Sequence, residues 1–118
     1  AVKAAKRQEI EEWRTEQEAQ PFIFEWNGHS WNGGPDSMAR LYTVVMSAKS
    51  VTARKTMVWC DAENRQVKLS MQQLDELLTA MAQAQVDRND EIYRRQREMK
   101  DELNNLDDLK SVRNFMLE

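Results

Sequence analysis

All three glycines of the chain lie between residues 28 and 34, which restricts where the backbone can turn sharply. Asn27-Gly28 separates two aromatic segments, FIFEW and HSWN. Asn-Gly between such segments is a strong signal for a hairpin, because both central residues of the favoured turn need a positive φ. Gly33-Gly34-Pro35 then interrupts the second segment. The stretch predicts a β-hairpin followed by an exit of the chain from the sheet.

A second hairpin and a helix are predicted after this stretch. Asp36 or Ser37 can cap a helix whose apolar residues recur at i, i+3, i+4 and i+7. The segments TMVWC and RQVKL then flank the turn-forming residues 61–64, which predicts the second hairpin. The apolar helix positions are Met38, Leu41, Tyr42, Val45 and Ala48.

Charged, helix-like segments flank this central region. Residues 1–20 form the first, which Pro21 ends because proline cannot continue a helix. Ser70 and Gln73 match a capping box, which predicts the start of a long helix. Beyond residue 86 its apolar positions alternate with charged ones, so we expect the helix to leave the core and pack only intermittently. We expect a break at Asn104-Asn105 and a short terminal helix containing Leu106, Leu109, Val112 and Phe115.

The length of 118 residues is typical of one domain. We therefore predict a single domain over residues 1–118, made of a leading helix (1–20), an α+β core (21–86) and a polar helical extension (87–118). The predicted fold class is α+β: two short β-hairpins packed with an N-terminal helix, a middle helix and a long charged C-terminal helix.

Composition argues against several classes of function. The formal net charge of −3 gives no general basic footprint, so binding to nucleic acid is not favoured. No apolar run approaches the roughly 20 residues that cross a bilayer, and the N-terminus lacks the apolar centre of a signal peptide. One cysteine and one histidine do not supply the four or so ligands of a zinc site, and the glycines do not match a phosphate-binding fingerprint. We predict no cofactor and no metal.

A catalytic pair is the one enzymatic interpretation that the residue types allow. Cys60 could act as a nucleophile with His29 as its base. The strand position of Cys60 beside Trp59 instead favours a buried, inert thiol, and a histidine next to a turn is more typical of a surface residue. Acidic pairs such as Asp61 and Glu63 are typical of turns, where they serve as caps and keep the surface soluble. We therefore predict that the protein is not an enzyme.

The remaining candidates are apolar side chains that could bind a partner protein. Trp59 shares a face with Met57 and is expected in the core, whereas Trp31 fits a core position and an interface anchor equally well. On the long helix, an incomplete apolar seam could pack against another helix or against copies of the chain. The predicted partner-binding residues are Trp31, Leu78, Ile92 and Met99.

The order of these motifs resembles a domain family of unknown function. The resemblance rests on an aromatic hairpin ending in W-N-x-x-x-D-S, a helix continuing M-A-R-L, and the segment V-W-C-D-A-E-N-R-Q-V-K-L-S before a long charged helix. It extends from about Lys6 to Leu109, and its most specific part comprises Trp59, Asp61 to Asn64, Val67 and Leu69. The chain has Gly33-Gly34 where an aspartate is commoner in that family.

The resemblance implies a function in bacteriophages. Domains of this kind occur, usually C-terminally, in tail, tail-fibre and fibre-assembly-associated proteins of tailed phages and prophages. It implies a non-enzymatic protein–protein interaction module in virion structure or fibre assembly, with other tail or fibre proteins as partners and a homotrimer as one form. The implied location is the virion tail or the cytoplasm of the infected host. Because the sequence begins with Ala1, we expect a fragment or a processed start.

The alternative from another class is a small regulator of phage or host that binds nucleic acid. Its basic side chains would contact phosphates while Trp31 stacks on a base, and binding would weaken steeply with added salt. The basic residues are Lys49, Arg54, Lys55, Arg65 and Lys68.

Overall fold

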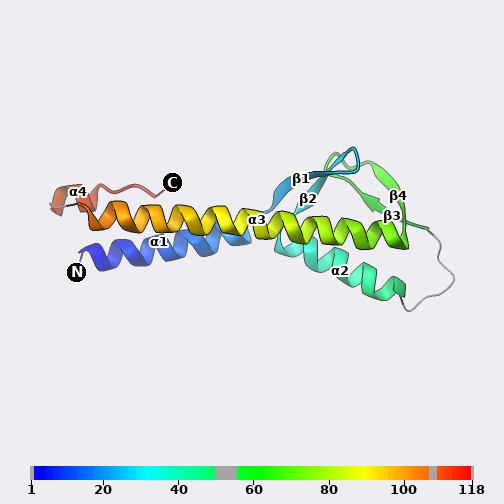
Figure 1. Cartoon of the computed structure of the whole chain (residues 1–118), viewed down its shortest axis with the longest axis horizontal. Helices are drawn as coiled ribbons and strands as arrows, with labels where there is room; N and C mark the ends of the chain where they lie inside the picture. Colours follow the sequence, from blue (N-terminus) through cyan, green and yellow to red (C-terminus); the bar gives the residue numbers. More distant parts are fainter. Residues whose placement is uncertain (1, 50–55, 107–108, 118) are drawn as a thin grey trace. The chain divides into compact units, whose positions relative to one another are not determined.

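The computed structural model describes residues 2–49, 56–106 and 109–117, and its fold class is α+β, as predicted (Figure 1). Each sheet has two antiparallel strands. In chain order the elements are α1 (Val2–Ala19), β1 (Phe22–Trp26), β2 (His29–Gly33), α2 (Pro35–Lys49), β3 (Thr56–Cys60), β4 (Gln66–Ser70), α3 (Met71–Asn104) and α4 (Leu109–Arg113).

The chain divides into two compact units. Residues 20–87 form one, here called the core unit. Residues 1–19 and 88–118 form the other, here called the helical unit. The divisions fall next to the limits expected from the sequence at residues 20 and 86. The pairing of the two outer segments into one unit was not foreseen.

In the core unit, the first hairpin has the turn that the sequence predicts. Trp26 pairs with His29 across Asn27 and Gly28, whose φ angles are 52° and 76°. Both values lie in the left-handed region that the favoured two-residue turn requires. The register places Phe24 opposite Trp31. The prediction of a hairpin at this Asn-Gly pair is confirmed.

The second hairpin leads directly into α3. Strand β3 pairs with β4 so that Cys60 lies opposite Gln66. At the end of β4 the capping box is present: Ser70 Oγ accepts from the Gln73 N–H at 3.1 Å, and Gln73 Oε1 accepts from the Ser70 N–H at 2.9 Å. These two bonds satisfy backbone donors that the start of a helix otherwise leaves open.

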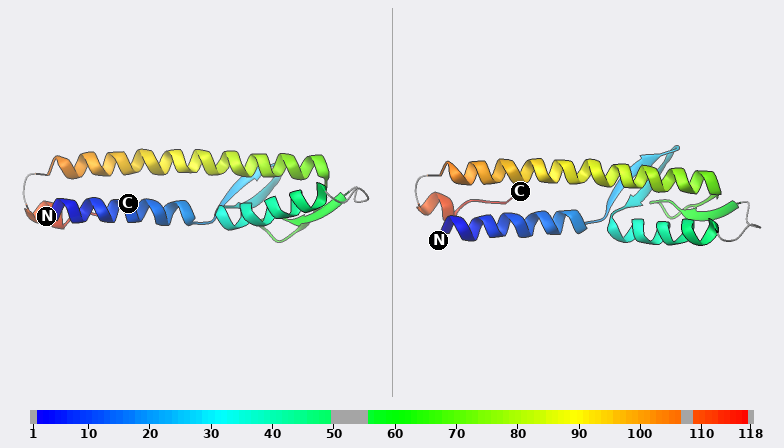
Figure 2. Two further views of the ribbon diagram at one scale, coloured as in Figure 1. Left: turned by 90° about the horizontal axis from the view of Figure 1, so that it is seen from below. Right: turned by 60° about the horizontal axis from the view of Figure 1, so that its bottom comes forward.

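The core of this unit lies between α2, the hairpins and the first half of α3, which runs beside α2 in both views of Figure 2. Leu41 and Val45 of α2 are buried as predicted, whereas Tyr42 is 54% exposed. Tyr42 therefore belongs to the outer face of α2, and its assignment to the buried stripe was wrong. The buried side chains of the cluster are Trp31, Leu41, Val45, Leu69, Leu74, Leu77 and Met81.

In the helical unit, α1 runs antiparallel to the second half of α3 (Figures 1 and 2). Side-chain contacts fix this pairing from Arg7 to Arg14 of α1. Arg7 Nη2 donates to Asn104 Oδ1 at 2.7 Å, and the guanidinium of Arg14 lies 5.3 Å from the centre of the Tyr93 ring. Between them Lys100 Nζ lies 2.9 Å from Glu11 Oε1.

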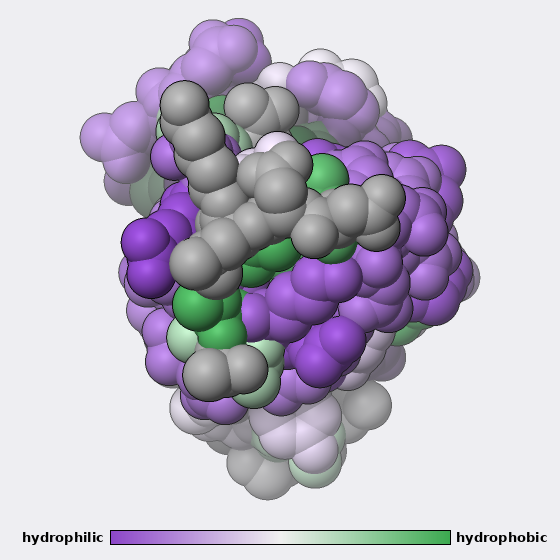
Figure 3. Space-filling model, turned by 90° about the vertical axis from the view of Figure 1, so that its left-hand side faces the viewer, coloured by the Kyte–Doolittle hydropathy of each residue, from purple (hydrophilic) through white to green (hydrophobic). Residues whose placement is uncertain are grey.

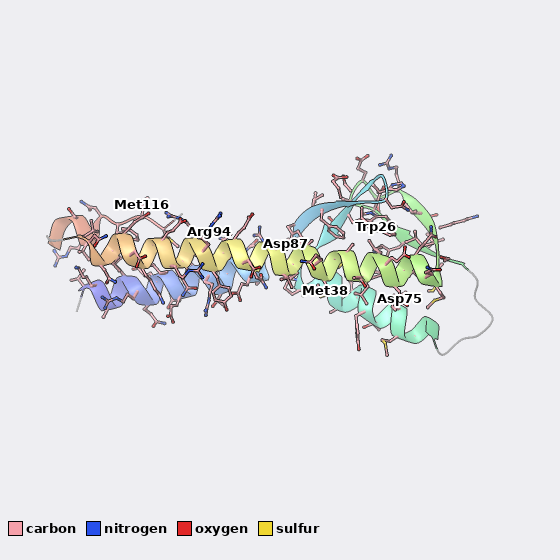
Figure 4. All side chains as sticks on the ribbon, viewed as in Figure 1. Trp26, Met38, Asp75, Asp87, Arg94 and Met116 are labelled. Carbon is pink, nitrogen blue, oxygen red and sulfur yellow. The ribbon has the colours of Figure 1, made fainter. Side chains whose placement is uncertain are left out.

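The expectation that α3 packs only intermittently after residue 86 was wrong. Ile10 of α1, Met99 and Leu103 of α3 and Val112 of α4 form one buried apolar cluster. Of the charged residues that interrupt the apolar pattern, Arg95 forms ion pairs with Glu98 and Glu102 on α3 itself. In the view of Figure 3, hydrophilic residues surround a smaller group of hydrophobic ones. Arg94, labelled in Figure 4, is exposed.

The predicted break and terminal helix are both present. Helix α3 ends at Asn104, the first of the two asparagines. Helix α4 follows at Leu109–Arg113, and its Val112 is 3% exposed. Phe115, just beyond α4, packs against the same cluster.

Candidate functional site

A buried carboxylate joins the two hairpins. Asp61 follows β3 directly, and its side chain is fully buried. Its Oδ1 accepts from the backbone N–H groups of Glu63 at 3.0 Å and Arg65 at 2.8 Å. Its Oδ2 lies 3.0 Å from His29 Nδ1 and 3.1 Å from Arg65 Nε. An ionised carboxylate only accepts hydrogen bonds, so the His29 proton lies on Nδ1.

These contacts decide the protonation of Asp61. Burial by itself would raise the pKa of the Asp61 carboxyl, because it disfavours the charged form. Hydrogen bonds from the backbone and side chain of Arg65, from His29 and from the backbone of Glu63 outweigh burial and hold this pKa below its ordinary value. Asp61 is therefore a stable anion whose charge is compensated within the core unit.

A backbone bond adds a second link between the hairpins. The N–H of Ala62 donates to the carbonyl oxygen of Ser30 on β2 at 2.8 Å. Together with the Asp61–His29 contact, it holds the loop after β3 against the start of β2. Strands β2 and β3 are therefore held together at one end.

Beside these links lies a half-open cleft of about 370 Å³. Strand β2, the first turns of α2, strand β3 and the loop that follows it each contribute to its walls. This volume is in the range that accommodates a short peptide or a small molecule. The lining residues are Asn32, Ser37, Arg40, Val58, Trp59, Cys60, Asp61 and Asn64.

Arg40 is the cation of the cleft. Its one hydrogen bond within the described part of the chain is a long one, 3.4 Å from Nη2 to Ser37 Oγ, and none of the described carboxylates pairs with it. The Asp61 charge, by contrast, is already bound by His29 and Arg65. The uncompensated charge in the cleft is therefore positive, next to the apolar side chains of Val58 and Trp59.

Trp31 is a core residue. It is 1% exposed, its Nε1 donates to the carbonyl oxygen of Trp26 at 2.9 Å, and its ring contacts those of Trp26 and His29. This burial and these contacts give Trp31 a packing role in the core unit, and a partner-binding role for Trp31 stays a prediction. Trp59 packs partly against the same core, as expected, and also lines the cleft.

The predicted seam on α3 is covered by other parts of the chain. Leu78 packs, half-buried, against the core cluster. Ile92 is 7% exposed. Met99 is fully buried in the cluster of the helical unit to which α1 contributes Ile10. The seam was expected to face a partner protein. In the helical unit, α1 instead occupies the position expected for that partner. A partner-binding role for these residues stays a prediction.

Cys60 is exposed, so the prediction of a buried thiol was wrong. Its side chain points to the face of β3 opposite to that of Trp59, because successive side chains alternate along a strand. Within the described residues no hydrogen bond joins Cys60 to His29, whose Nδ1 instead contacts Asp61. Reaction of Cys60 with a thiol reagent therefore follows from exposure and would not by itself indicate catalysis.

Of the five basic residues of the nucleic-acid hypothesis, the structure describes the side chains of Arg65 and Lys68. Arg65 is bound to Asp61 and Glu63. Lys68 is exposed on β4. Arg54, Lys55 and the side chain of Lys49 lie outside the described part of the structure.

The described residues contain neither a metal-binding cluster nor a helix that could cross a membrane. Among residues 2–49, 56–106 and 109–117, no three histidine, cysteine or acidic side chains gather in a way that could hold a metal ion. Among those same ranges, every helix is too short or too polar to span a bilayer.

The sequence contained a signal for Asp61 that was interpreted only as a turn. An aspartate that opens a turn accepts hydrogen bonds from N–H groups a few residues later, and here those donors are Glu63 and Arg65. The contact of Asp61 with His29 depends on how the two hairpins pack against each other, and no neighbouring residues in the sequence indicate it. Arg40 was not predicted as a site residue, because its position beside the cleft depends on the same packing.

Comparisons with known proteins agree with the sequence resemblance at the level of the family. The family described as a domain of unknown function (DUF4376) matches residues 1–114, nearly the whole chain. Searches of curated proteins and of solved structures found no match. The chain belongs to the DUF4376 family.

Proposed function

We propose that the chain is a non-enzymatic protein–protein interaction module of a phage or prophage tail or tail-fibre protein that acts in virion structure or fibre assembly. The phage context rests on the sequence resemblance described above. The module would work in the virion tail or in the cytoplasm of the infected host, docked to other tail or fibre proteins or to two further copies of itself.

The observation that carries this proposal is a second apolar face on α2. Tyr42 and Met46 are 54% and 48% exposed, and each directly follows a buried residue of the same helix, Leu41 and Val45. Their face is therefore turned by about 100° from the buried face. Residues four apart are neighbours on a helix surface, so these two side chains form one apolar patch. Apolar patches of this kind mark interaction sites more often than isolated exposed residues do.

Cross-linking in phage-producing cells tests the proposal. A photo-reactive amino acid at Tyr42 should form a covalent adduct with another virion protein or with a second copy of the chain. The control places the same amino acid at Thr43, which is also exposed on α2. Equal cross-linking at both positions, or none at Tyr42 while particles assemble normally, would contradict the proposal.

The oligomeric state is tested separately by light scattering over a hundredfold concentration range. A homotrimer should dissociate when Tyr42 and Met46 are both changed to serine, while the thermal midpoint of the core unit stays unchanged. If the chain is a monomer at every concentration, self-assembly is excluded and the partner must be a different protein.

A further inference from the structure

Two strands of the core unit present an unpaired edge to the cleft. Strand β2 pairs with β1 alone and strand β3 pairs with β4 alone, because each sheet has two strands. Asn32 of β2 and Val58 and Cys60 of β3 all line the cleft. The direction of their backbone groups decides whether a further strand could bind there.

On β2, the register of the hairpin shows which way the backbone N–H and C=O groups point. Trp26 and His29 flank a two-residue turn and exchange both backbone hydrogen bonds, and bonded pairs then alternate with unbonded ones. The N–H and C=O groups of Ser30 and Asn32 therefore point away from β1. The bond from Ala62 N–H to Ser30 O agrees with this direction. Among the described residues, no backbone group outside the β1–β2 hairpin bonds to Asn32.

On β3, a backbone hydrogen bond in the loop gives the direction of the N–H and C=O groups in the same way. Asp61 N–H donates to Arg65 O at 2.9 Å, so Asp61 faces across its own hairpin. By alternation, the backbone groups of Cys60 and Val58 point outward from β3. Val58 is also 50% exposed. An open edge with unpaired N–H and C=O groups can accept a further strand.

The charge and the side chains of the cleft indicate which kind of peptide could bind there. Arg40 lacks a carboxylate partner among the described residues, while Asp61 is fully engaged by its four hydrogen bonds. A guanidinium without a partner favours a carboxylate, with which it can form charge-assisted hydrogen bonds. Val58 and Trp59 add apolar area for a neighbouring side chain.

We propose that the cleft binds an extended segment of another protein, which adds as a strand to the open edge of β3 and places an aspartate or glutamate side chain on Arg40. Backbone hydrogen bonds to Val58 and Cys60 would supply affinity, and Arg40 would supply the preference for an acidic residue. This inference rests on the proposed function as an interaction module and names the chemistry of one partner.

The probe is a capped hexapeptide of alternating valine and glutamate, titrated to millimolar concentration into the isotopically labelled chain. The backbone amide signals of Asn32, Val58 and Cys60 should shift together, and saturating peptide should slow the alkylation of the exposed Cys60. Unchanged signals at all three residues would overturn the proposal.

A proline variant tests strand addition itself. Val58→Pro removes an outward N–H and leaves the bonds between β3 and β4 in place, because proline is tolerated at outward positions of edge strands. It should weaken peptide binding by about tenfold, whereas Val58→Ala, which keeps the N–H, should weaken it less. The remaining amide signals and the thermal midpoint report whether the variant is folded. Equal binding by a folded Val58→Pro variant would overturn strand addition.

A charge variant tests the role of Arg40. Arg40→Gln should weaken binding of the glutamate peptide by about tenfold and should not weaken binding of a lysine-containing peptide. Arg94→Gln, at an exposed arginine of the helical unit, is the matched control. Equal loss in both variants, or equal binding of glutamate and lysine peptides by the unchanged chain, would overturn the assignment of Arg40.

Two further probes separate strand addition from a site for small anions. Free glutamate should leave the Val58 and Cys60 amides unchanged, and the same hexapeptide with N-methylated peptide bonds should not bind. If either binds as well as the hexapeptide, the proposal fails. Failure of these titrations leaves the cross-links at Tyr42 unaffected, so failure of the inference is distinguishable from failure of the proposed function.

Discussion

Ile10 of α1 and Met99 of α3 are both fully buried in the same apolar cluster, although they come from opposite ends of the chain. The first helix thus supplies one side of a small core and the second half of the long helix supplies the other. Met99 was predicted to bind a partner protein. Its burial instead indicates that it contributes to the stability of the fold.

Met99→Ser should destabilise the helical unit by at least about 2 kcal/mol, because it removes a buried side chain and leaves a cavity with a hydroxyl in it. Urea unfolding followed by circular dichroism measures this loss. Met116→Ser is the control, since Met116 is 73% exposed, and its effect should stay within about 0.5 kcal/mol. Weakened association with unchanged unfolding in Met99→Ser would instead support a seam that binds a partner.

Gln96→Leu should stabilise the helical unit by about 1 kcal/mol. Gln96 is 7% exposed, and its Oε1 has no hydrogen-bond partner among the described residues. Replacing a buried, unsatisfied polar group by an apolar one of similar size removes its desolvation cost. The urea midpoint measures the change. The matched control is Gln8→Leu at an exposed position of α1, and an equal gain there would show that burial of Gln96 is not the cause.

Asp61 should make the core unit sensitive to acid. Its pKa is lower in the folded chain than its ordinary value of 3.8, so its carboxylate stabilises the fold above that value. This stabilisation should be lost as the pH falls below 3.8 and through the lowered pKa. Asp61→Asn should lower the thermal midpoint at neutral pH and should flatten its decline in acid.

Thermal melts of the Asp61 variant across the acidic range provide this measurement. Asp90→Asn, at an exposed position of α3, is the control and should retain the acid dependence of the unchanged chain. If Asp61→Asn and the unchanged chain lose stability in parallel, the hydrogen bonds to Asp61 do not contribute to the dependence.

Gly34→Ala should destabilise the core unit more than Gly28→Ala. Both residues have positive φ, and an alanine there costs about 1–2 kcal/mol in backbone strain. A Cβ on Gly34 would also lie 3.0 Å from the Cα of Pro21 and 3.2 Å from the carbonyl oxygen of Gln20, whereas a Cβ on Gly28 would meet no atom within 4 Å. Urea unfolding of the two variants compares them directly, and equal losses would mean that the chain near Pro21 yields without cost.

Local chemistry made much of the fold predictable. The Asn27-Gly28 turn and the Ser70 capping box each follow from a few adjacent residues, and the structure contains both. The Asp61–His29 contact and the burial of Met99 depend on segments that are distant in sequence, and a single sequence carries no local signal for them. The cleft has the same origin, since strands from separate hairpins form its walls.

The pairing of α1 with the second half of α3 has a consequence for synthesis on the ribosome. Residues 20–87 leave the ribosome as one continuous stretch, so the core unit can fold while translation continues. The first helix emerges before the core unit but must wait for residues 88–118 before Ile10 is covered. During that interval a newly made helix with an open apolar stripe is available to chaperones or to neighbouring nascent chains.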